Sequence, residues 1–386
     1  MKGLAILLVV ISHLYGQTLE AGQDLVKLPD LGSIGVAVFL VLSGFGICQS
    51  VQHKGIQDFF FKRTVRIYVP VVLGVSIKIV LDFLSGRTEK GLISSFASIF
   101  FNLPKVHSHL WYILFIFFWY CVVYFMVRLG IQDRLKLLLM GLISAAILLV
   151  PDLSPSWKVN AFSFPLGYCL GLHAEWFLNT LNRWLKAPLY WLFGAIALCF
   201  ALSNFFKSCE IAFSEPGMFG TFLAIACFCL IAAFLLVRQG SVSHHLSMKK
   251  VSLGLICLAM TPYLGWVFRE PIAGEENVGK WVFANLTRLL FAAGLMLLIT
   301  LFVRFNRYSI GLKFLGDISY EVYILHGIFM VHYDFILFRG PLEVTFFVYL
   351  AFVCILSLWL NRLSGSVSNW IFTRCRETFS SRKLSA

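Results

Sequence analysis

Lys2 and His13 stand at the two ends of an apolar run and pair a fixed cation with a group that exchanges a proton near neutral pH. They are eleven residues apart. At 100° and 1.5 Å per residue, that spacing returns a helix to within about 20° of its starting face and spans roughly 16 Å. Both side chains would line one side of a helix, with the imidazole well inside a membrane. Ionisable groups are costly there, so the pair predicts a functional site.

Three further cations follow the second apolar run. Lys62, Arg63 and Arg66 lie close together in one short segment. Residues three apart on a helix are neighbours, so the two guanidinium groups would share a face. Such a pair can hold a phosphate or pyrophosphate through paired hydrogen bonds. A basic segment that only contacts lipid headgroups is the alternative interpretation.

A polar stripe marks the eleventh apolar run. Ser319, Tyr323 and His326 are spaced i, i+4 and i+7, which places them on one helix face. Interhelical hydrogen bonding and catalysis both explain such a stripe. Asp317 is expected to cap this helix, and Glu321 suits its first turn.

Three other groups of polar or aromatic residues have ordinary structural explanations as well as functional ones. Lys78 and Asp82 are an i, i+4 pair that is expected to neutralise itself. Arg288 either snorkels outward or faces a cavity for an acceptor. His109 and Trp111 open the fourth run, where they suit an interfacial aromatic belt or the lining of an outer vestibule.

The elements that position these residues must be helices that cross a membrane. The chain is 59% hydrophobic and 13% charged, with a mean hydropathy of +0.83, whereas soluble domains contain about 25% charged residues. The sequence therefore predicts an all-α fold, a polytopic bundle of 10–12 transmembrane helices. The apolar runs lie near residues 3–18, 33–50, 67–84, 109–127, 135–150, 157–174, 188–205, 217–237, 251–268, 282–303, 318–337 and 343–361.

Lysine and arginine set the expected orientation. With a cytoplasmic N-terminus, 21 of the 32 basic residues fall in inside segments and nine fall outside. Both termini are then cytoplasmic, and the net charge of +13 reflects topology and anionic lipid rather than nucleic acid. One transmembrane domain, residues 1–372, would precede a basic cytoplasmic tail, residues 373–386. No Cys-x-x-Cys pair offers a metal site.

Taken together, these motifs resemble the membrane-bound acyltransferase-3 family over residues 2 to about 335. Its members O-acetylate lipopolysaccharide, peptidoglycan, exopolysaccharides and other acceptors. The family more often has arginine where this chain has Lys2, which keeps the charge but loses the planar fork. The matching motifs are the basic residue and histidine of the first helix (Lys2, His13), Phe-x-x-Ser-Gly-Phe in the second (Phe39 to Phe45, including Ser43), Arg-x-x-Arg in the first inside loop (Arg63, Arg66), His-Leu-Trp (His109 to Trp111) and Ser-Tyr-x-x-Tyr-x-x-His (Ser319 to His326).

The resemblance implies acetyl-CoA, or a related acyl-CoA, as the donor, and a hydroxyl of a cell-surface glycan or another envelope component as the acceptor, with no metal. His13 would be catalytic, either as a general base or as a carrier of the acyl group. The remaining roles implied are acyl-CoA binding by Arg63, Arg66 and Lys62, support or positioning of the acyl group by Lys2, Ser43, Tyr323 and His326, and acceptor-side contacts by His109, Trp111 and Arg288.

The resemblance also places the chain in a bacterial inner membrane as a multi-pass protein. No SGNH hydrolase-like domain, which some members carry, is expected in this chain, so a second transfer step would need a separate extracytoplasmic protein. The main alternative is a transporter or flippase of a lipid-linked glycan or hydrophobic anion, which would also need a basic inner mouth. A non-catalytic membrane scaffold is a third possibility.

Overall fold

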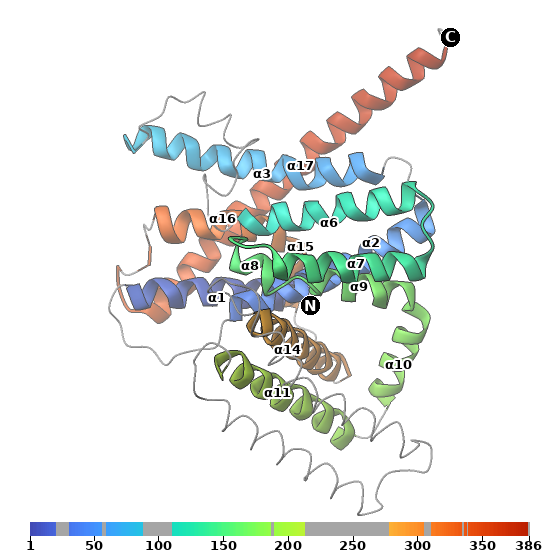
Figure 1. Ribbon diagram of the computed structural model, residues 1–386. Helices are drawn as coiled ribbons and strands as arrows, with labels where there is room; N and C mark the ends of the chain where they lie inside the picture. The colour runs from blue at the N-terminus through green and yellow to red at the C-terminus, as the bar shows by residue number, and fades with distance from the viewer. Residues whose placement is uncertain are drawn as a thin grey trace, which may run out of the picture. The chain divides into compact units, whose positions relative to one another are not determined.

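The computed structural model describes residues 1–20, 31–55, 59–87, 110–186, 189–212, 278–304, 310–333, 336–337 and 339–384. Every regular element within these ranges is a helix (Figure 1). The helices are α1 (Lys2–Glu20), α2 (Leu31–Lys54), α3 (Phe59–Leu84), α6 (Trp111–Arg128), α7 (Asp133–Leu149), α8 (Pro155–Lys158), α9 (Ser163–Leu172), α10 (Ala174–Lys186), α11 (Leu189–Ala212), α14 (Val278–Arg304), α15 (Ile310–Asp317), α16 (Ser319–Gly327), the π-helix η2 (Ile328–His332) and α17 (Leu342–Leu384).

Five of the described helices contain segments long and apolar enough to cross a membrane. Together with the absence of strands from the described residues, they confirm the predicted all-α polytopic bundle. The expected runs at 217–237 and 251–268 lie outside the described residues. The five segments are Leu31–His53, Phe60–Leu84, Trp111–Arg128, Val278–Ile299 and Val344–Cys375, and two shorter apolar segments are Lys2–Gly16 and Phe193–Lys207.

The expected continuous span at 157–174 is wrong, because α8 ends at Lys158 and α9 begins at Ser163. Pro165 explains the new start: proline lacks an N–H and is tolerated in the first turn of a helix but not in its interior. Pro165 has no N–H to donate to the carbonyl of Ala161. That carbonyl instead accepts a hydrogen bond from Ser144 Oγ at 2.8 Å. The interruption is therefore built into the sequence.

The expected span at 318–337 is also shorter and less regular than predicted. The α-helical part, α16, ends at Gly327, and the chain continues as the π-helix η2 to His332. π-Helical turns are rare and often occur at functional sites. This one directly follows His326.

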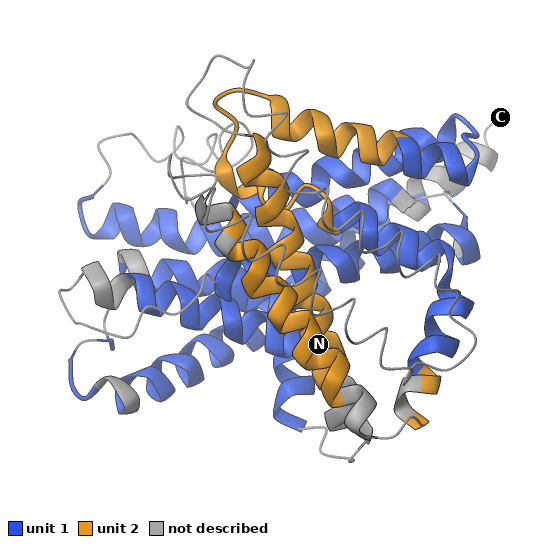
Figure 2. Cartoon of the chain, turned by 60° about the horizontal axis from the view of Figure 1, so that its bottom comes forward, with its two compact units in different colours: residues 1–138, 164–181, 302–386 blue, residues 139–163, 182–301 orange. Residues whose placement is uncertain are grey.

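Contacts between Cα atoms divide the chain into two compact units (Figure 2). Unit 1 comprises residues 1–138, 164–181 and 302–386. Within it, α1 packs against α2, α15 and α16, and α17 packs against α3 and α16. Glycine permits a close approach of α1 and α2: a Cβ on Gly35 of α2 would meet the main chain of Ala5 on α1. Small residues commonly make such contacts in membrane bundles.

Unit 2 comprises residues 139–163 and 182–301. Aromatic rings join α11 to α14 at two levels: Phe200 lies 4.8 Å from Phe291, and Phe206 lies 5.9 Å from Phe283, both measured between ring centroids. A Cβ on Gly294 would press against the Phe200 ring. Unit 2 is thus held together by interlocking aromatic side chains and small residues.

Candidate active site

Two histidines from helices far apart in the sequence meet inside unit 1. Nδ1 of His13, on α1, lies 2.7 Å from Nε2 of His326, on α16. The ring planes are within 5° of parallel. His326 is fully buried and His13 is partly buried. The predicted intramembrane imidazole therefore belongs to a hydrogen-bonded histidine pair.

Hydrogen bonds fix the tautomers of this pair. Nδ1 of His326 lies 2.8 Å from the carbonyl oxygen of Tyr323 and 3.1 Å from that of Val322. A carbonyl only accepts, so Nδ1 of His326 carries a proton and, in the neutral ring, Nε2 is an acceptor. Nδ1 of His13 must then donate the hydrogen bond between the rings. The neutral pair consequently keeps its basic lone pair on Nε2 of His13.

A third helix restrains His326. The hydroxyl of Tyr349, on α17, donates a 2.6 Å hydrogen bond to the carbonyl oxygen of His326. Both residues are almost completely buried. That carbonyl lies at the junction between α16 and η2, where regular α-helical hydrogen bonding ends. The Tyr349 contact stabilises the main chain at this junction.

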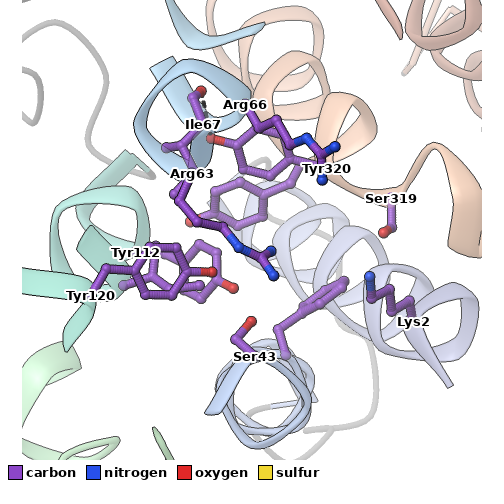
Figure 3. A pocket seen from close by; sticks show the side chains of 12 residues that line it. Lys2, Ser43, Arg63, Arg66, Ile67, Tyr112, Tyr120, Ser319 and Tyr320 are labelled. Carbon is purple, nitrogen blue, oxygen red and sulfur yellow. Dashed lines mark hydrogen bonds between the residues drawn. The ribbon is translucent and has the colours of Figure 1, made fainter. Parts of the chain in front are cut away.

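A cavity of about 310 Å³ lies in the same unit, bounded by α1, α2, α3, α6 and α16 (Figure 3). Among the described residues, its lining includes three cations, Lys2, Arg63 and Arg66, and no carboxylate. Hydroxyl groups supply most of the other polar atoms, and all of them can donate hydrogen bonds. This chemistry suits an anion. The remaining lining residues are Phe39, Ser43, Ile67, Tyr112, Ile116, Tyr120, Ser319, Tyr320 and Tyr323.

Close helix packing places the first cation. Gly3 lies so near α15 that a Cβ would overlap the carbonyl of Leu312, and Gly316 also lies close to Gly3 and to the Lys2 side chain. Ser319 Oγ donates to the Gly316 carbonyl at 2.9 Å. Lys2 therefore reaches the cavity from a helix in direct main-chain contact with α15, and Ser319, the first residue of α16, is tied to α15 by its hydrogen bond.

A tyrosine fixes the segment that carries the two arginines. The hydroxyl of Tyr320 donates to the carbonyl of Ile67, next to Arg66, at 3.0 Å (Figure 3). Pro70 lies one turn further along α3 and cannot donate to the Arg66 carbonyl. The Tyr320 hydrogen bond thus holds α16 against α3 at the turn where the backbone hydrogen bonding of α3 is incomplete.

Hydroxyl groups gather opposite the cations. The Ser43 hydroxyl lies beside those of Tyr112 and Tyr120, and the Arg63 guanidinium group points into the same part of the cavity (Figure 3). Both tyrosines are buried. Together these groups present neutral donors next to a fixed positive charge. They could share the oxygen atoms of a bound phosphate with Arg63.

Tyr323 connects the cavity to the histidine pair. Its side chain lines the cavity, and its ring centroid lies 5.2 Å from that of Tyr112 and 5.7 Å from that of His326. Tyr323 is itself buried. The anion-binding cavity and the histidines are therefore separated by one aromatic ring.

Several predicted residues lie elsewhere. Lys62 is exposed and does not line the cavity. Trp111 packs against Tyr112 and Phe115, at 6.3 Å between ring centroids in each case, and likewise does not line it. Arg288 is buried within unit 2, and His109 lies outside the described residues.

The expected cap of α16 is wrong. Ile318 occupies the N-cap position without a side-chain hydrogen bond, because Asp317 is the last residue of α15. Glu321 is in the first turn, as expected, but it is buried and accepts a 3.0 Å hydrogen bond from Asn361 of α17. The carboxylate therefore contributes to packing between α16 and α17.

The ion pair of α3 is present, with 2.6 Å between Lys78 Nζ and Asp82 Oδ2. Tyr333 adds a 2.6 Å hydrogen bond to the other oxygen of the same carboxylate. Among the described residues, no group of three His, Cys, Asp or Glu side chains could hold a metal ion.

Three polar residues of the cavity, Tyr112, Tyr120 and Tyr320, escaped the sequence prediction. Tyr112 and Tyr120 are spaced i and i+8 with Ile116 between them, so helical periodicity places all three on one side of α6. Tyr320 sits between two residues of the predicted polar stripe, but its functional contact is a hydrogen bond to the main chain of another helix. The periodicity of α6 was a usable signal, whereas the Tyr320 contact was not readable from spacing.

A family model described as an acyltransferase domain matches residues 1–362 of the chain, which includes every residue of the cavity and both histidines. No curated protein and no solved structure matches the chain significantly.

Proposed function

The chain belongs to the acyltransferase 3 family, and from that premise we propose that it transfers an acetyl group from cytoplasmic acetyl-CoA to a hydroxyl of a cell-surface glycan. The supporting observation is the basic Nε2 of His13, fixed by the hydrogen bond to His326, beside a cavity with three cations. Nε2 of His13 suits proton transfer, and the cationic cavity suits the phosphates of a donor. A transporter would also need the cationic cavity, but the match to an acyltransferase domain favours the enzyme.

Acyl-CoA is long enough to extend from the cationic cavity to the histidine pair. CoA carries its phosphates at one end and its thioester at the end of a long flexible arm. In this proposal Lys2, Arg63 and Arg66 hold the phosphates in the cavity, and the arm extends past Tyr323 toward the histidines. Lys2 and His13 are eleven helical residues apart, which corresponds to roughly 16 Å along the axis of α1.

In the proposed reaction a single nitrogen, Nε2 of His13, accepts a proton and later gives it back. The acceptor hydroxyl gives its proton to Nε2 of His13 as its oxygen attacks the thioester carbonyl carbon. The carbon–sulfur bond then breaks, and the departing thiolate takes the proton back from His13. The hydrogen bond from Nδ1 of His13 to His326 stabilises the transient imidazolium. If His13 carries the acyl group instead, the same Nε2 forms the bond, so both routes depend on this tautomer.

Cells that make or lack the protein provide the direct test. Mass spectrometry of their surface glycans should show the mass of added acetyl groups only when the protein is present. His13→Ala should abolish this increment, whereas His53→Ala should keep it, because His53 is an exposed residue that contacts Gln49. Identical glycans with and without the wild-type protein would overturn the proposal. Loss of a larger acyl mass would correct the donor.

A further inference from the structure

A network of polar side chains lies within unit 1 at the end of α3 opposite to Arg63 and Arg66. Nζ of Lys78 lies 2.6 Å from one oxygen of the Asp82 carboxylate, and the hydroxyl of Tyr333 donates to the other oxygen at 2.6 Å. Lys78 and Tyr333 are almost completely buried. Both carboxylate oxygens have a partner, and buried networks that are satisfied in this way rigidify a structure. Tyr333 is therefore fixed to α3.

Two further contacts hold the Tyr333 side chain. Ser85 Oγ lies 3.1 Å from its hydroxyl oxygen, and the Arg87 guanidinium group lies over its ring, 5.0 Å from the centroid. Both residues belong to the segment that directly follows α3. The tyrosine is thus held through its hydroxyl and through the face of its ring.

The main chain of Tyr333 ends the π-helix that follows His326. Its N–H donates to the carbonyl of Ile328, five residues earlier, at 3.0 Å. Ile328 lies two residues after His326. Tyr349 restrains the start of η2 through the His326 carbonyl, and Asp82 restrains its end through Tyr333.

Two other contacts join the same segment to α3. Tyr320 donates to the Ile67 carbonyl at 3.0 Å, and a Cβ on Gly74 would overlap the side chain of Ile324. Both contacts precede the buried histidine of α16, whereas the Tyr333 network follows it. The segment is therefore attached to α3 on both sides of that histidine.

We infer that Asp82 and Tyr333 are positioning residues for acyl transfer, an inference that rests on the proposed function. They hold the end of η2, and η2 keeps His326 in place beside α1. His326 in turn orients His13 through the 2.7 Å hydrogen bond between the rings. Such a bond is lost when the rings separate by about 1 Å, so a small displacement of η2 would release the tautomer of His13. The Lys78–Asp82 pair thereby has a role beyond neutralising its own charges.

Tyr333→Phe is the test because it removes one hydroxyl and keeps the ring that Arg87 covers. Tyr124→Phe is the matched control, since the Tyr124 ring packs 5.0 Å from that of Phe60, near the start of α3 rather than its end. Each substitution is made in the wild type and in His326→Ala. Initial rates of acetyl transfer from acetyl-CoA to alkali-deacetylated surface glycan from the host cells are then measured with the purified full-length proteins.

Tyr333→Phe should lower kcat about tenfold, the effect of one lost hydrogen bond, and leave the KM for acetyl-CoA unchanged. In His326→Ala it should have no further effect on kcat, because the residue through which it acts is absent. Tyr124→Phe should change neither constant in either background. An unchanged kcat in Tyr333→Phe would overturn the inference. An equal loss of kcat in both backgrounds would also overturn it, because it would indicate a general effect on the fold.

Hydrogen exchange gives a readout that does not depend on activity. Peptides covering residues 319–333 should exchange faster in Tyr333→Phe than in the wild type or Tyr124→Phe, because η2 loses the side-chain contact at its end. Unchanged exchange would overturn the proposed link between Asp82 and η2. Absence of acetyl transfer by the wild type would instead overturn the proposed function.

Discussion

The hydroxyl of Tyr349 donates a hydrogen bond to the carbonyl of His326 at the point where α16 becomes a π-helix. Tyr349→Phe should remove this bond and leave a buried carbonyl, which costs about 1–3 kcal/mol. We expect a lower Tm and a lower kcat, because His326 orients His13. Tyr124→Phe is the control, since Tyr124 lies on α6, away from the histidine pair. A loss of stability without any change in kcat would show that Tyr349 supports the fold alone.

The histidine pair predicts non-additive mutations. His13→Ala should lower kcat by about 100-fold to 10,000-fold, the range typical of a lost general base. His326→Ala should also lower it, because His13 then loses the partner at 2.7 Å that fixes its tautomer. The double variant should be no worse than His13→Ala, since residues that act as a unit are not additive. Rates from all three variants check this, and simple multiplication of the two single effects would contradict it.

The two arginines predict a donor-specific defect. Arg63→Ala should raise the KM for acetyl-CoA by about tenfold or more, as expected for a lost charge-assisted hydrogen bond. Arg63→Lys should recover part of this loss, because lysine keeps the charge but not the planar fork. Lys62→Ala is the matched control, since Lys62 is the adjacent cation but does not line the cavity. A larger rise in KM in Lys62→Ala than in Arg63→Ala would contradict this prediction, because it would place phosphate binding on the face of α3 that carries Lys62.

The fold was predictable where long apolar runs continue without interruption, as in α2, α3 and α14. Prediction failed where local chemistry interrupts such a run. Pro165 starts a new helix inside the expected 157–174 span, and η2 ends the expected 318–337 span early. Hydropathy averages over these positions, so it detects the run but not the break.

The site was predictable where helical spacing alone decides it. Arg63 and Arg66, three residues apart on α3, both line the cavity as expected. Lys62, which was expected to join them, does not, because neighbouring residues on a helix point about 100° apart. That Lys2 of α1 lines the same cavity depends on packing between helices. His326 was expected only to support or position the acyl group, and packing between α1 and α16 makes it the partner of His13. Contacts between distant helices are set by shape, which residue types do not encode individually.

The close contact of Gly3 with α15 positions Lys2, so enlarging Gly3 should disturb acetyl-CoA binding. Gly3→Ala would drive a Cβ into the Leu312 carbonyl, so α1 and α15 must separate. Overpacking of this kind costs about 1–3 kcal/mol, and we expect a lower Tm together with a higher KM for acetyl-CoA, since Lys2 moves away from the cavity. Gly16→Ala, on the same helix, has open space around its Cβ and should stabilise α1 by up to about 1 kcal/mol. An unchanged KM for acetyl-CoA in Gly3→Ala would show that the α1 to α15 contact does not position Lys2.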